Sequence, residues 1–597
     1  MDTPRGFEFA PLIAARTWGC LLVMATLVAA NAAAQDFVRV TDPANPLVTD
    51  AYESGGGCWI DLVGDGALDL FVANGNLSVQ PNTLYRNTRA GTFVRVVTGA
   101  VAADGGSSIG GTFGDFDHDG RPDLFVTNRN NFGNFLYRGL GDTLFEKVTA
   151  VAPVTDIANS NSSSWVDVDG DGDLDLYVVN FSGADFLYVN SGAPGFSFTR
   201  VDTTALTAGG EFSIPGAWAD FNGDGLDDLF VGNAGTQNDY LYTNHGHLFF
   251  TRTVIADARS TLGASWGDYD NDGWLDLFVA HYTNQKGTLY HNSGPPSFSL
   301  VAIDTSIVSN SAGNWVGSGW GDYDNDGNLD LMVANDGANE ALYHNAGPPG
   351  YGFTKLTTGP VATSSGNSFG CVWGDYDADG QLDLFVANRL NQPNFLFRNL
   401  GGTANHWLNL RCAGTQSNAS AIGAKVRVWT TIAGEVRGQL REVTGQTGYN
   451  SQNLDQHFGM GEATGVDSLR VQWPSGRSEL WTNLPADAMQ VLTEGTSPVG
   501  MARPGAGVPD QLRLRLVSAN PTRGGAMLHF ALPRAGHARL DWIDLAGRRA
   551  GTAFDGWLGA GEHALRAELP AELPAGVVYG RLTHGGRESS VRLVRLR

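Results

Sequence analysis

The sequence predicts an all-β protein, a seven-bladed β-propeller followed by two small β domains. At roughly 100–200 residues per domain, its 597 residues are enough for several domains. The 79 glycines and the 10% aromatic content are typical of a turn-rich β protein. One segment also recurs seven times at intervals of 48 to 54 residues, and a fixed period of this length indicates a repeat architecture.

The composition excludes several classes of protein. With 42% hydrophobic and 17% charged residues, the chain is too apolar to be disordered throughout. The excess of 62 acidic over 38 basic residues argues against a nucleic-acid partner, because binding phosphate groups requires a basic surface. Four cysteines are too few for a disulfide scaffold of this size.

Residues 1–34 have the pattern of a secretory signal peptide. Arg5 and Arg16 precede an apolar run over residues 18–30, which ends in small residues up to Ala34. The run is shorter than the roughly 20 residues of a membrane-spanning helix, and no second long apolar stretch follows. We therefore expect cleavage near Ala34, no transmembrane segment, and a secreted or cell-surface protein.

Each repeat contains four predicted strands. Small residues and usually a Trp precede an acidic loop, and an apolar run such as residues 277–280 follows it. A Leu-Tyr-x-Asn strand comes next, for example residues 289–292, and then a strand built on Phe-x-x-Val. Short runs of β-branched and aromatic residues between Gly and Asn turns are typical of strands. Four such strands form one propeller blade, so the repeats predict a propeller over residues 35–402.

The two ends of the repeat region predict that the ring closes. The last copy leaves the pattern at Gly401 without a fourth strand, and residues 37–40 (Phe-Val-Arg-Val) belong to no other copy. We expect residues 37–40 to be the fourth strand of the seventh blade. Joining the first and last repeats in this way leaves no open sheet edge.

The acidic loop, Asp-x-Asp-x-Asp-Gly-x-x-Asp, has the composition of a calcium site. Calcium takes six to eight oxygen ligands, and carboxylates at positions 1, 3, 5 and 9 with a backbone carbonyl at position 7 supply them. Glycine at position 6 permits the sharp turn. The predicted ligands, loop by loop, are Asp61, Asp65 and Asp69; Asp115, Asp117, Asp119 and Asp123; Asp167, Asp169, Asp171 and Asp175; Asp220, Asn222, Asp224 and Asp228; Asp268, Asp270, Asp272 and Asp276; Asp322, Asp324, Asp326 and Asp330; and Asp375, Asp377, Asp379 and Asp383.

The seven loops predict up to seven calcium ions of unequal affinity. The first loop has Val63 at position 3, and we expect the weakest site there, whereas Asn222 of the fourth loop keeps a neutral oxygen. A single Asp-Gly loop is equally consistent with a hairpin turn, but repetition favours a cation. A loop closed by its own ligands leaves no open position for chemistry. We therefore expect a structural role, in which calcium stabilises the native state.

The face opposite the acidic loops is the expected ligand surface. The acidic loop joins strands 1 and 2, so the 2–3 and 4–1 connections lie on the other face. Several of these connections are long and rich in Asn, including residues 74–82, 128–134 and 281–287. Loops on a rigid scaffold often carry function, and amide-rich loops suit a carbohydrate or a protein ligand. The alternative is that Asn and Gly only form the turns.

The small residues before each loop place strand 1 at the crowded centre of the propeller. Cys58 and Cys371 then lie on this strand in the first and seventh blades. Because their registers differ by one residue, we expect two buried thiols in preference to a disulfide.

The expected function is non-catalytic adhesion or recognition. An enzyme needs acid, base or nucleophile groups gathered in a pocket, but most acids belong to the loops. His291 and His344 occupy the strand position held by Arg86 in the first blade, and we predict that they are exposed. No phosphate loop, zinc spacing or nucleophile elbow is present. The alternatives are an extracellular enzyme acting on polysaccharide, either a lyase or a quinone-dependent dehydrogenase, and a structural component of the cell envelope.

Two parts of the chain resemble known families. The repeats resemble the FG-GAP/VCBS repeats of bacterial surface proteins and integrin α-chains, which carry the same calcium loop. Residues 403–497 resemble the ASPIC/UnbV domain through the segments 441–452, 457–461 and 471–476. This pairing is that of the cartilage acidic protein family, to which no reaction is assigned. His457 and Gln452 could form a site there, but a hydrogen-bonded structural histidine is the stronger expectation.

The C-terminal part has the composition of a separate module. Residues 498–509 are rich in Pro, Gly and Ala and are predicted to be a linker. Residues 510–597 resemble FlgD-like, immunoglobulin-type or type IX secretion C-terminal domains through segments such as 544–548 and 574–579. Residues 502–597 contain 14 Arg, no Lys and 8 acidic residues, opposite in sign to the remainder. The resemblance implies an export or surface-attachment domain.

Overall fold

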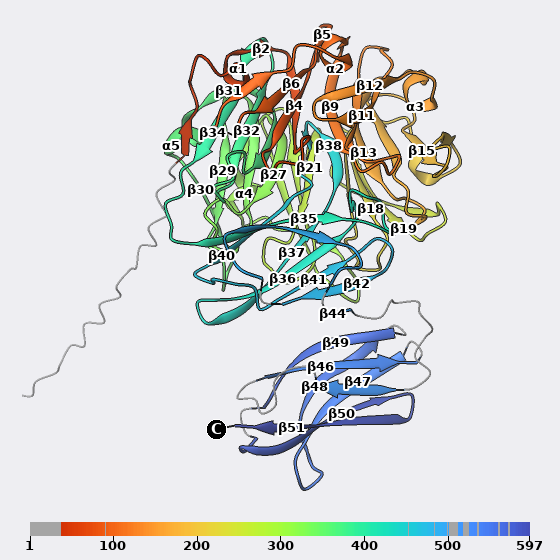
Figure 1. Ribbon diagram of the computed structural model, residues 1–597, viewed down its shortest axis with the longest axis vertical. Coiled ribbons are helices and arrows are strands. Elements are labelled where there is room, and N and C mark those ends of the chain that lie inside the picture. Colours follow the sequence, from red (N-terminus) through yellow and green to blue (C-terminus); the bar gives the residue numbers. More distant parts are fainter. Residues whose placement is uncertain are drawn as a thin grey trace, which may run out of the picture.

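The computed structural model shows an all-β protein of three parts (Figure 1). It describes residues 37–596 except 90, 452, 483, 498, 501–511, 517–524, 534–535, 559–560 and 571–572. The predicted signal peptide lies outside the described residues. In the described part of the chain, none of the helices has the length and apolar character that crossing a bilayer requires.

Each repeat forms a four-stranded antiparallel blade with its strands in sequence order, except that β1 is the outer strand of the seventh blade. The end of strand 2 of the sixth blade also pairs with the first strand of the seventh. The sheets, from the first repeat to the seventh, are β3 (Ser54–Ile60), β4 (Asp69–Asn74), β6 (Thr83–Asn87) and β7 (Phe93–Arg95); β9 (Ser108–Gly114), β10 (Asp123–Asn128), β11 (Phe135–Gly141) and β12 (Leu144–Val148); β13 (Ser160–Val166), β14 (Asp175–Asn180), β15 (Phe186–Asn190) and β16 (Phe198–Val201); β17 (Ser213–Ala219), β18 (Asp228–Asn233), β19 (Asp239–Asn244) and β20 (Phe250–Ile255); β21 (Thr261–Gly267), β22 (Asp276–His281), β24 (Thr288–Asn292) and β25 (Leu300–Ala302); β27 (Trp315–Gly321), β28 (Asp330–Asn339), β29 (Ala341–Asn345) and β30 (Phe353–Lys355); and β31 (Ser365–Gly374), β32 (Asp383–Asn388), β34 (Phe395–Asn399) and β1 (Phe37–Arg39).

The ring closes as the sequence predicts. Strand β1 pairs antiparallel with β34, with Phe37 opposite Asn399 and Arg39 opposite Phe397. The innermost strand of each sheet contacts the innermost strands of the next and the previous sheet, and β31 of the last sheet contacts β3 of the first. Strand 1 is therefore the axial strand. Cys58 and Cys371 lie on it as buried thiols, as expected.

Short elements tie neighbouring blades together on the face opposite the acidic loops. The small helices α1 (Pro46–Thr49), α2 (Ala100–Ala103), α3 (Ala152–Thr155), α4 (Ile307–Asn310), α5 (Gly359–Thr363) and η1 (Ala205–Thr207) lie in the 4–1 connections. Two-stranded ladders join β2 (Ala51–Tyr52) to β33 (Gln392–Pro393), β5 (Gln80–Pro81) to β8 (Gly105–Gly106), and β23 (Gln285–Lys286) to β26 (Ala312–Gly313). Each ladder pairs the 2–3 loop of one blade with the entry to the next.

A Trp-Gly pair precedes the fifth, sixth and seventh acidic loops, and packing between blades explains it. The indole of Trp373 donates a hydrogen bond of 3.1 Å to the carbonyl of Gly319 in the preceding blade. A Cβ atom on Gly321 would lie only 2.9 Å from the Trp373 ring, so glycine is required there. The indole of Trp59 packs as closely against Gly374, where a Cβ atom would lie 2.7 Å from the ring.

The second domain covers the acidic-loop side of the propeller (Figure 1). We call residues 403–500 the cap domain. One of its sheets contains β40 (Gln456–Gly461), β35 (His406–Ala413) and β43 (Ala488–Thr493), and the other contains β37 (Glu435–Glu442), β36 (Lys425–Ile432), β41 (Ser468–Gln472), β42 (Ser478–Trp481) and β44 (Val499–Gly500). Strand β44 pairs with β42, so the predicted linker at 498–509 begins too early.

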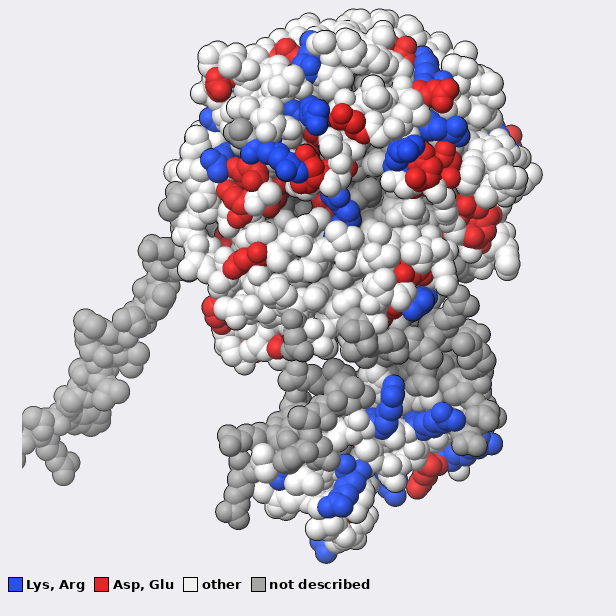
Figure 2. All heavy atoms as spheres, in the orientation of Figure 1, with Lys and Arg blue, Asp and Glu red and all other residues white. Residues whose placement is uncertain are grey.

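The C-terminal part is a separate two-sheet β domain. One sheet contains β45 (Arg513–Leu516), β46 (Gly525–Leu532) and β49 (Gly561–Glu568), and the other β48 (Arg549–Leu558), β47 (Gly536–Ile543), β50 (Gly576–His584) and β51 (Arg587–Arg595). Its own hydrophobic core includes Leu528, Trp542 and Leu582. Lys and Arg outnumber Asp and Glu on its described surface in Figure 2, in line with the arginine excess in the sequence.

Candidate functional site

The acidic loops share one hydrogen-bonding pattern. In the second loop, the position 1 carboxylate of Asp115 accepts the backbone N–H groups of Asp119 (3.1 Å) and Gly120 (2.8 Å). The position 9 carboxylate of Asp123 accepts the N–H of Phe116 (2.9 Å) and, across the sheet, that of Gly139 (2.8 Å). Gly120 has a φ of +82°, a conformation that suits glycine. The loop therefore winds around its own carboxylates.

Several carboxylate oxygens in these loops are buried and have no hydrogen-bond partner. They are the Oδ1 atoms of Asp117, Asp169, Asp324 and Asp377 at position 3 and of Asp268 at position 1. Ligand atoms from three carboxylates lie within 4.8 Å of one another in the second loop (Asp115, Asp117, Asp123) and in the third loop (Asp167, Asp169, Asp175). Buried polar atoms are normally satisfied, and hard oxygens converging on one point are the ligand set of calcium. These residues therefore fit a calcium ion.

Burial of the position 9 aspartates shifts their ionisation. Burial, opposed by backbone hydrogen bonds and reinforced by the neighbouring loop carboxylates, raises the pKa of Asp123 to about 8. It raises the pKa of Asp175 and of Asp228 to about 9. Charged carboxylates are unfavourable here without a counter-charge. A divalent cation would supply that charge.

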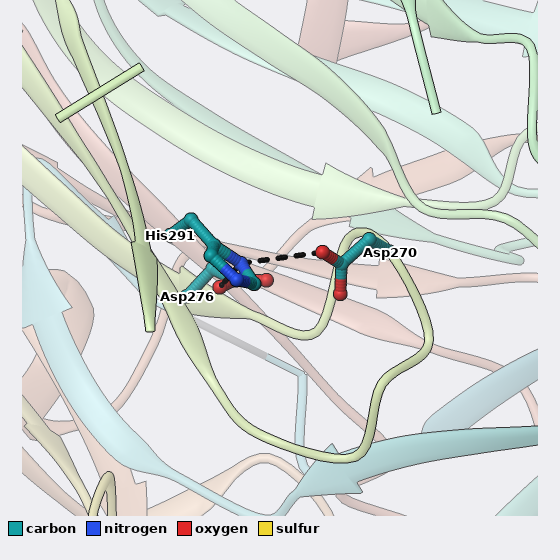
Figure 3. Close-up of side chains that lie close together, drawn as sticks. All are labelled: Asp270, Asp276 and His291. Carbon is teal, nitrogen blue, oxygen red and sulfur yellow. Dashed lines mark ion pairs between the residues drawn. The ribbon is translucent and has the colours of Figure 1, made fainter. Parts of the chain in front are cut away.

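The structure contradicts the prediction that His291 and His344 are exposed strand residues. The Nδ1 atom of His291 lies 3.2 Å from a carboxylate oxygen of both Asp270 and Asp276 (Figure 3). The Nδ1 atom of His344 lies 3.2 Å from Asp330 Oδ1 in the same way. The hydrogen bond with Asp276 raises the pKa of His291 to about 9. Both rings therefore face the acidic loop.

The same strand position holds Arg138 and Arg398 in the second and seventh blades. Their Nε atoms lie 2.6 Å from Oδ2 of Asp117 and Asp377, the position 3 aspartates. Sequence reasoning missed this contact. The available signal was the recurrence of Arg or His at one strand position, next to an acidic loop, in five of the seven copies (Arg86, Arg138, His291, His344 and Arg398).

The cap domain contacts the acidic loops directly, which the sequence did not reveal. The contacts are Arg411 Nη1 to Asp61 Oδ2 (3.0 Å), Asp115 N to Ser420 Oγ (2.9 Å), Lys425 Nζ to Asp220 Oδ2 (3.1 Å), Arg427 Nη2 to Gly273 O (2.8 Å), Gly461 N to Asn325 O (2.8 Å) and Asn409 Nδ2 to Asp375 Oδ2 (3.2 Å). They reach the first, second, fourth, fifth, sixth and seventh loops. The interface between the two domains is therefore built largely on the acidic loops.

A hairpin of the cap domain enters the axial channel of the propeller. Strands β38 (Gly445–Gly448) and β39 (Asn450–Ser451) form the hairpin, and β38 pairs antiparallel with β13. Together the two strands contact all seven axial strands. Tyr449 at the tip is 2% exposed and packs among Ile109, Val316, Phe369 and other axial residues. Arg129 donates a 3.0 Å hydrogen bond to its hydroxyl. The hairpin therefore plugs the channel.

His457 has a structural role, as expected. Its Nδ1 lies 2.7 Å from Asn409 Oδ1 and its Nε2 lies 2.6 Å from Asn325 Oδ1, so it joins the cap to the sixth loop. Burial lowers the pKa of His457 to about 3. Gln452, its expected companion, lies outside the described residues.

A cavity of about 360 Å³ lies between the cap and the propeller. The indoles of Trp266, Trp320 and Trp373, from corresponding positions in consecutive blades, line one side, and Arg441 and His457 of the cap line the other. Burial, opposed by Asp322 and Asp268, lowers the pKa of Arg441 to about 10, which still leaves it charged near neutral pH. The cavity is thus aromatic on the propeller side, and on the cap side the Arg441 guanidinium is accompanied by the acidic residues Glu442, Asp455 and Asp487.

Comparison with known families accounts for the repeats. The FG-GAP-like repeat matches residues 61–126, 115–178, 167–231, 220–279, 268–333 and 322–386, which together span more than half of the chain and include all seven loops. The chain belongs to the FG-GAP-like repeat family. A second family, ASPIC and UnbV, matches residues 414–499, which lie in the cap domain.

The chain is also similar to cartilage acidic protein 1. It is 25% identical over 461 residues to the proteins of Mus musculus and Homo sapiens, in each case over 70% of this chain. The alignment covers 60% and 59% of those two proteins, so the chain spans about three fifths of their length. Among solved structures, the V. cholerae biofilm matrix protein Bap1 aligns with 91% of this chain and 73% of its own at 11% identity, with a TM-score of 0.27.

Proposed function

We propose that this protein is a secreted, calcium-binding propeller that recognises a carbohydrate or protein ligand without catalysis. The observation that carries the calcium part is the set of buried carboxylate oxygens without hydrogen-bond partners at position 3 of four loops. The family match adds support, since the aligned repeats include every loop. Calcium bound in the loops supplies the counter-charge that the buried aspartates require and holds the blades and the cap in place.

The environment of the cavity between cap and propeller supports a non-catalytic role. A general base needs a ring nitrogen or carboxylate oxygen that can reach a substrate. Asparagine side chains lie against both nitrogens of His457, at 2.7 and 2.6 Å, so neither nitrogen is open to a substrate. Asp455, another residue that lines this cavity, receives two hydrogen bonds of 2.7 Å from Arg411.

The position of the cap favours a ligand site on the opposite face of the propeller. The cap covers the acidic loops, so the 2–3 and 4–1 connections are the accessible loops of the ring. Phe212 is 45% exposed there and stacks on Phe181 with ring centroids 5.3 Å apart. The guanidinium of Arg129 lies 5.2 Å from the Phe181 ring. Exposed aromatic faces beside amide and guanidinium groups suit the apolar faces and hydroxyls of a sugar.

A glycan array screened with the full chain in calcium and in EDTA tests this proposal. We expect specific retention in calcium that Phe212→Ala reduces at least tenfold. Phe249→Ala is the matched control, because Phe249 is 61% exposed but lies in the turn between β19 and β20, on the side of the acidic loops. No retention of any glycan leaves a protein ligand as the remaining form of the proposal. Turnover of a bound polysaccharide contradicts the non-catalytic role.

The C-terminal domain is proposed to serve export or attachment to the cell surface. Its arginine-rich composition and separate core support an independent module. N-terminal sequencing and mass measurement of the secreted protein test both ends. Cleavage near Ala34 is expected, and retention of residues 1–34 contradicts secretion by a signal peptide.

A further inference from the structure

The first acidic loop differs from the others in the partners of its carboxylates. Val63 replaces the position 3 aspartate and supplies no oxygen. Asp61 at position 1 accepts the backbone N–H groups of Gly64 (2.8 Å), Asp65 (3.0 Å) and Gly66 (2.9 Å). The carboxylates of Asp61, Asp65 and Asp69 do not appear among the described side chains that have buried, unpartnered oxygens. This loop therefore lacks the buried, unpartnered carboxylate oxygen that indicates a cation in five of its sister loops.

Two guanidinium groups approach the first loop instead. Arg411 of the cap places Nη1 3.0 Å from Asp61 Oδ2, and two hydrogen bonds of 2.7 Å to Asp455 fix its orientation. Arg89 of the first blade places Nε 2.9 Å from Asp65 Oδ2 and also donates to the carbonyl of Asp65. The Asp61 side chain is 1% exposed and that of Arg411 is 28% exposed, whereas Arg89 is 57% exposed. Arg411 therefore makes the stronger of the two ion pairs.

The arginines of the second and seventh loops act differently. Arg138 contacts Oδ2 of Asp117, and Arg398 contacts Oδ2 of Asp377 and of Asp379. The Oδ1 oxygens of Asp117 and Asp377 remain buried without partners. In the described part of the chain, Lys425 is the other Lys or Arg paired with a position 1 aspartate, but its loop retains the side-chain oxygen of Asn222 at position 3. Only the first loop combines a missing ligand with an arginine on its position 1 aspartate.

The formal charge of the first loop with its two arginines and Asp455 equals that of a four-aspartate loop with one calcium ion. Asp61, Asp65, Asp69 and Asp455 carry four negative charges, and Arg411 and Arg89 carry two positive charges. Four loop aspartates and one calcium ion give the same balance. We propose that the first loop binds no calcium, and that Arg411, assisted by Arg89, takes the place of the ion. The cap domain is thereby joined to the propeller at this loop whether or not calcium is present.

The proposal rests on the proposed function, because it assumes that the sister loops bind calcium. It is tested by counting calcium ions bound to the full chain by native mass spectrometry after equilibration in millimolar calcium. The matched variants are Asp61→Asn and Asp115→Asn, which change the same position of the first and second loops. We expect Asp115→Asn to lose one ion relative to the wild type and Asp61→Asn to lose none.

A variant in which the first loop has the ligands of its sister loops gives the complementary test. Val63→Asp combined with Arg411→Met restores the missing ligand and removes the guanidinium, and we expect one ion more than in the wild type. Arg398→Met, which removes an arginine from the seventh loop, is the control and is expected to leave the count unchanged. Loss of one ion in Asp61→Asn overturns the proposal. A wild-type protein that binds no calcium contradicts the proposed function instead.

Discussion

Removal of calcium is the perturbation to which this fold should respond most strongly. Five loops, the second, third, fifth, sixth and seventh, carry a full set of four aspartates. The position 9 aspartates are buried at the start of strand 2 in the middle of each blade, so a change in the loop reaches the core directly. We expect chelation to lower the melting temperature of the propeller without changing that of the C-terminal domain, which has its own core.

The expected decrease in melting temperature follows from the free energy by which bound calcium stabilises the native state. Extracellular calcium sites have dissociation constants of about 10⁻⁴–10⁻³ M. With about 10 mM free calcium and a constant of about 10⁻⁴ M, each site stabilises the native state by about 2.7 kcal/mol. Five sites then contribute about 13 kcal/mol. The entropy of unfolding is about 2.1 cal/mol/K per residue, which gives about 0.8 kcal/mol/K for a propeller of roughly 360 residues. Dividing the lost free energy by this entropy gives an expected decrease in melting temperature of about 15–20 °C.

Differential scanning calorimetry of the full chain measures this shift. Scans in 10 mM CaCl₂, in EDTA and in EDTA followed by excess calcium separate reversible ion loss from damage. Equimolar MgCl₂ in place of calcium is the control, and we expect it to recover little of the shift because magnesium demands a stricter octahedral geometry. A propeller transition that stays within about 2 °C in EDTA contradicts stabilisation of the propeller by calcium.

Three further predictions concern pH, the plug and the C-terminal domain. The pKa of Asp123 in the folded chain is about 8, above the unfolded value of about 3.9. Calcium-free protein therefore gains stability as pH falls from about 8 to 5, and urea titrations in EDTA showing the opposite slope contradict this assignment. Tyr449→Ala removes a ring that is 2% exposed and should destabilise the docked cap by about 3–5 kcal/mol, seen as faster protease cleavage between β34 and β35. Tyr579→Ala, which is 37% exposed, is its control, and equal cleavage of the two variants contradicts the plug. Deletion of residues 501–597 should leave the propeller transition within about 2 °C, and a larger drop indicates that the domains stabilise one another.

The periodic part of this protein was predictable because local sequence fixes it. Each blade repeats the same order of strands, an aromatic residue two positions before the acidic loop, and the loop itself, so seven copies reinforce one interpretation. The role of residues 37–40 was predictable as well, since a missing strand at one end matched an extra strand at the other. The pairing of Phe37 with Asn399 confirms this closure.

Contacts between distant segments were not predictable in the same way. The segment around Tyr449 was recognisable as a family motif, but only the packing shows that it fills the axial channel, where Tyr449 approaches Gly56 and Gly370 too closely for any larger residue. Arg411 and Asp61 are 350 residues apart in the chain. The exposure of His291 was predicted wrongly because the acidic loop of the same blade covers the face of the strand to which this side chain points. The sequence shows the strand but not this contact.

We propose that calcium ions bound in the acidic loops hold the blades in a closed ring. Anomalous diffraction from crystals grown in calcium tests it most directly, since the scattering locates each ion without reference to stability. We expect strong peaks inside the loops that begin at Asp115, Asp167, Asp268, Asp322 and Asp375, and none in the loop that begins at Asp61. Full loops without density, with arginine or histidine side chains pointing into them, would contradict it.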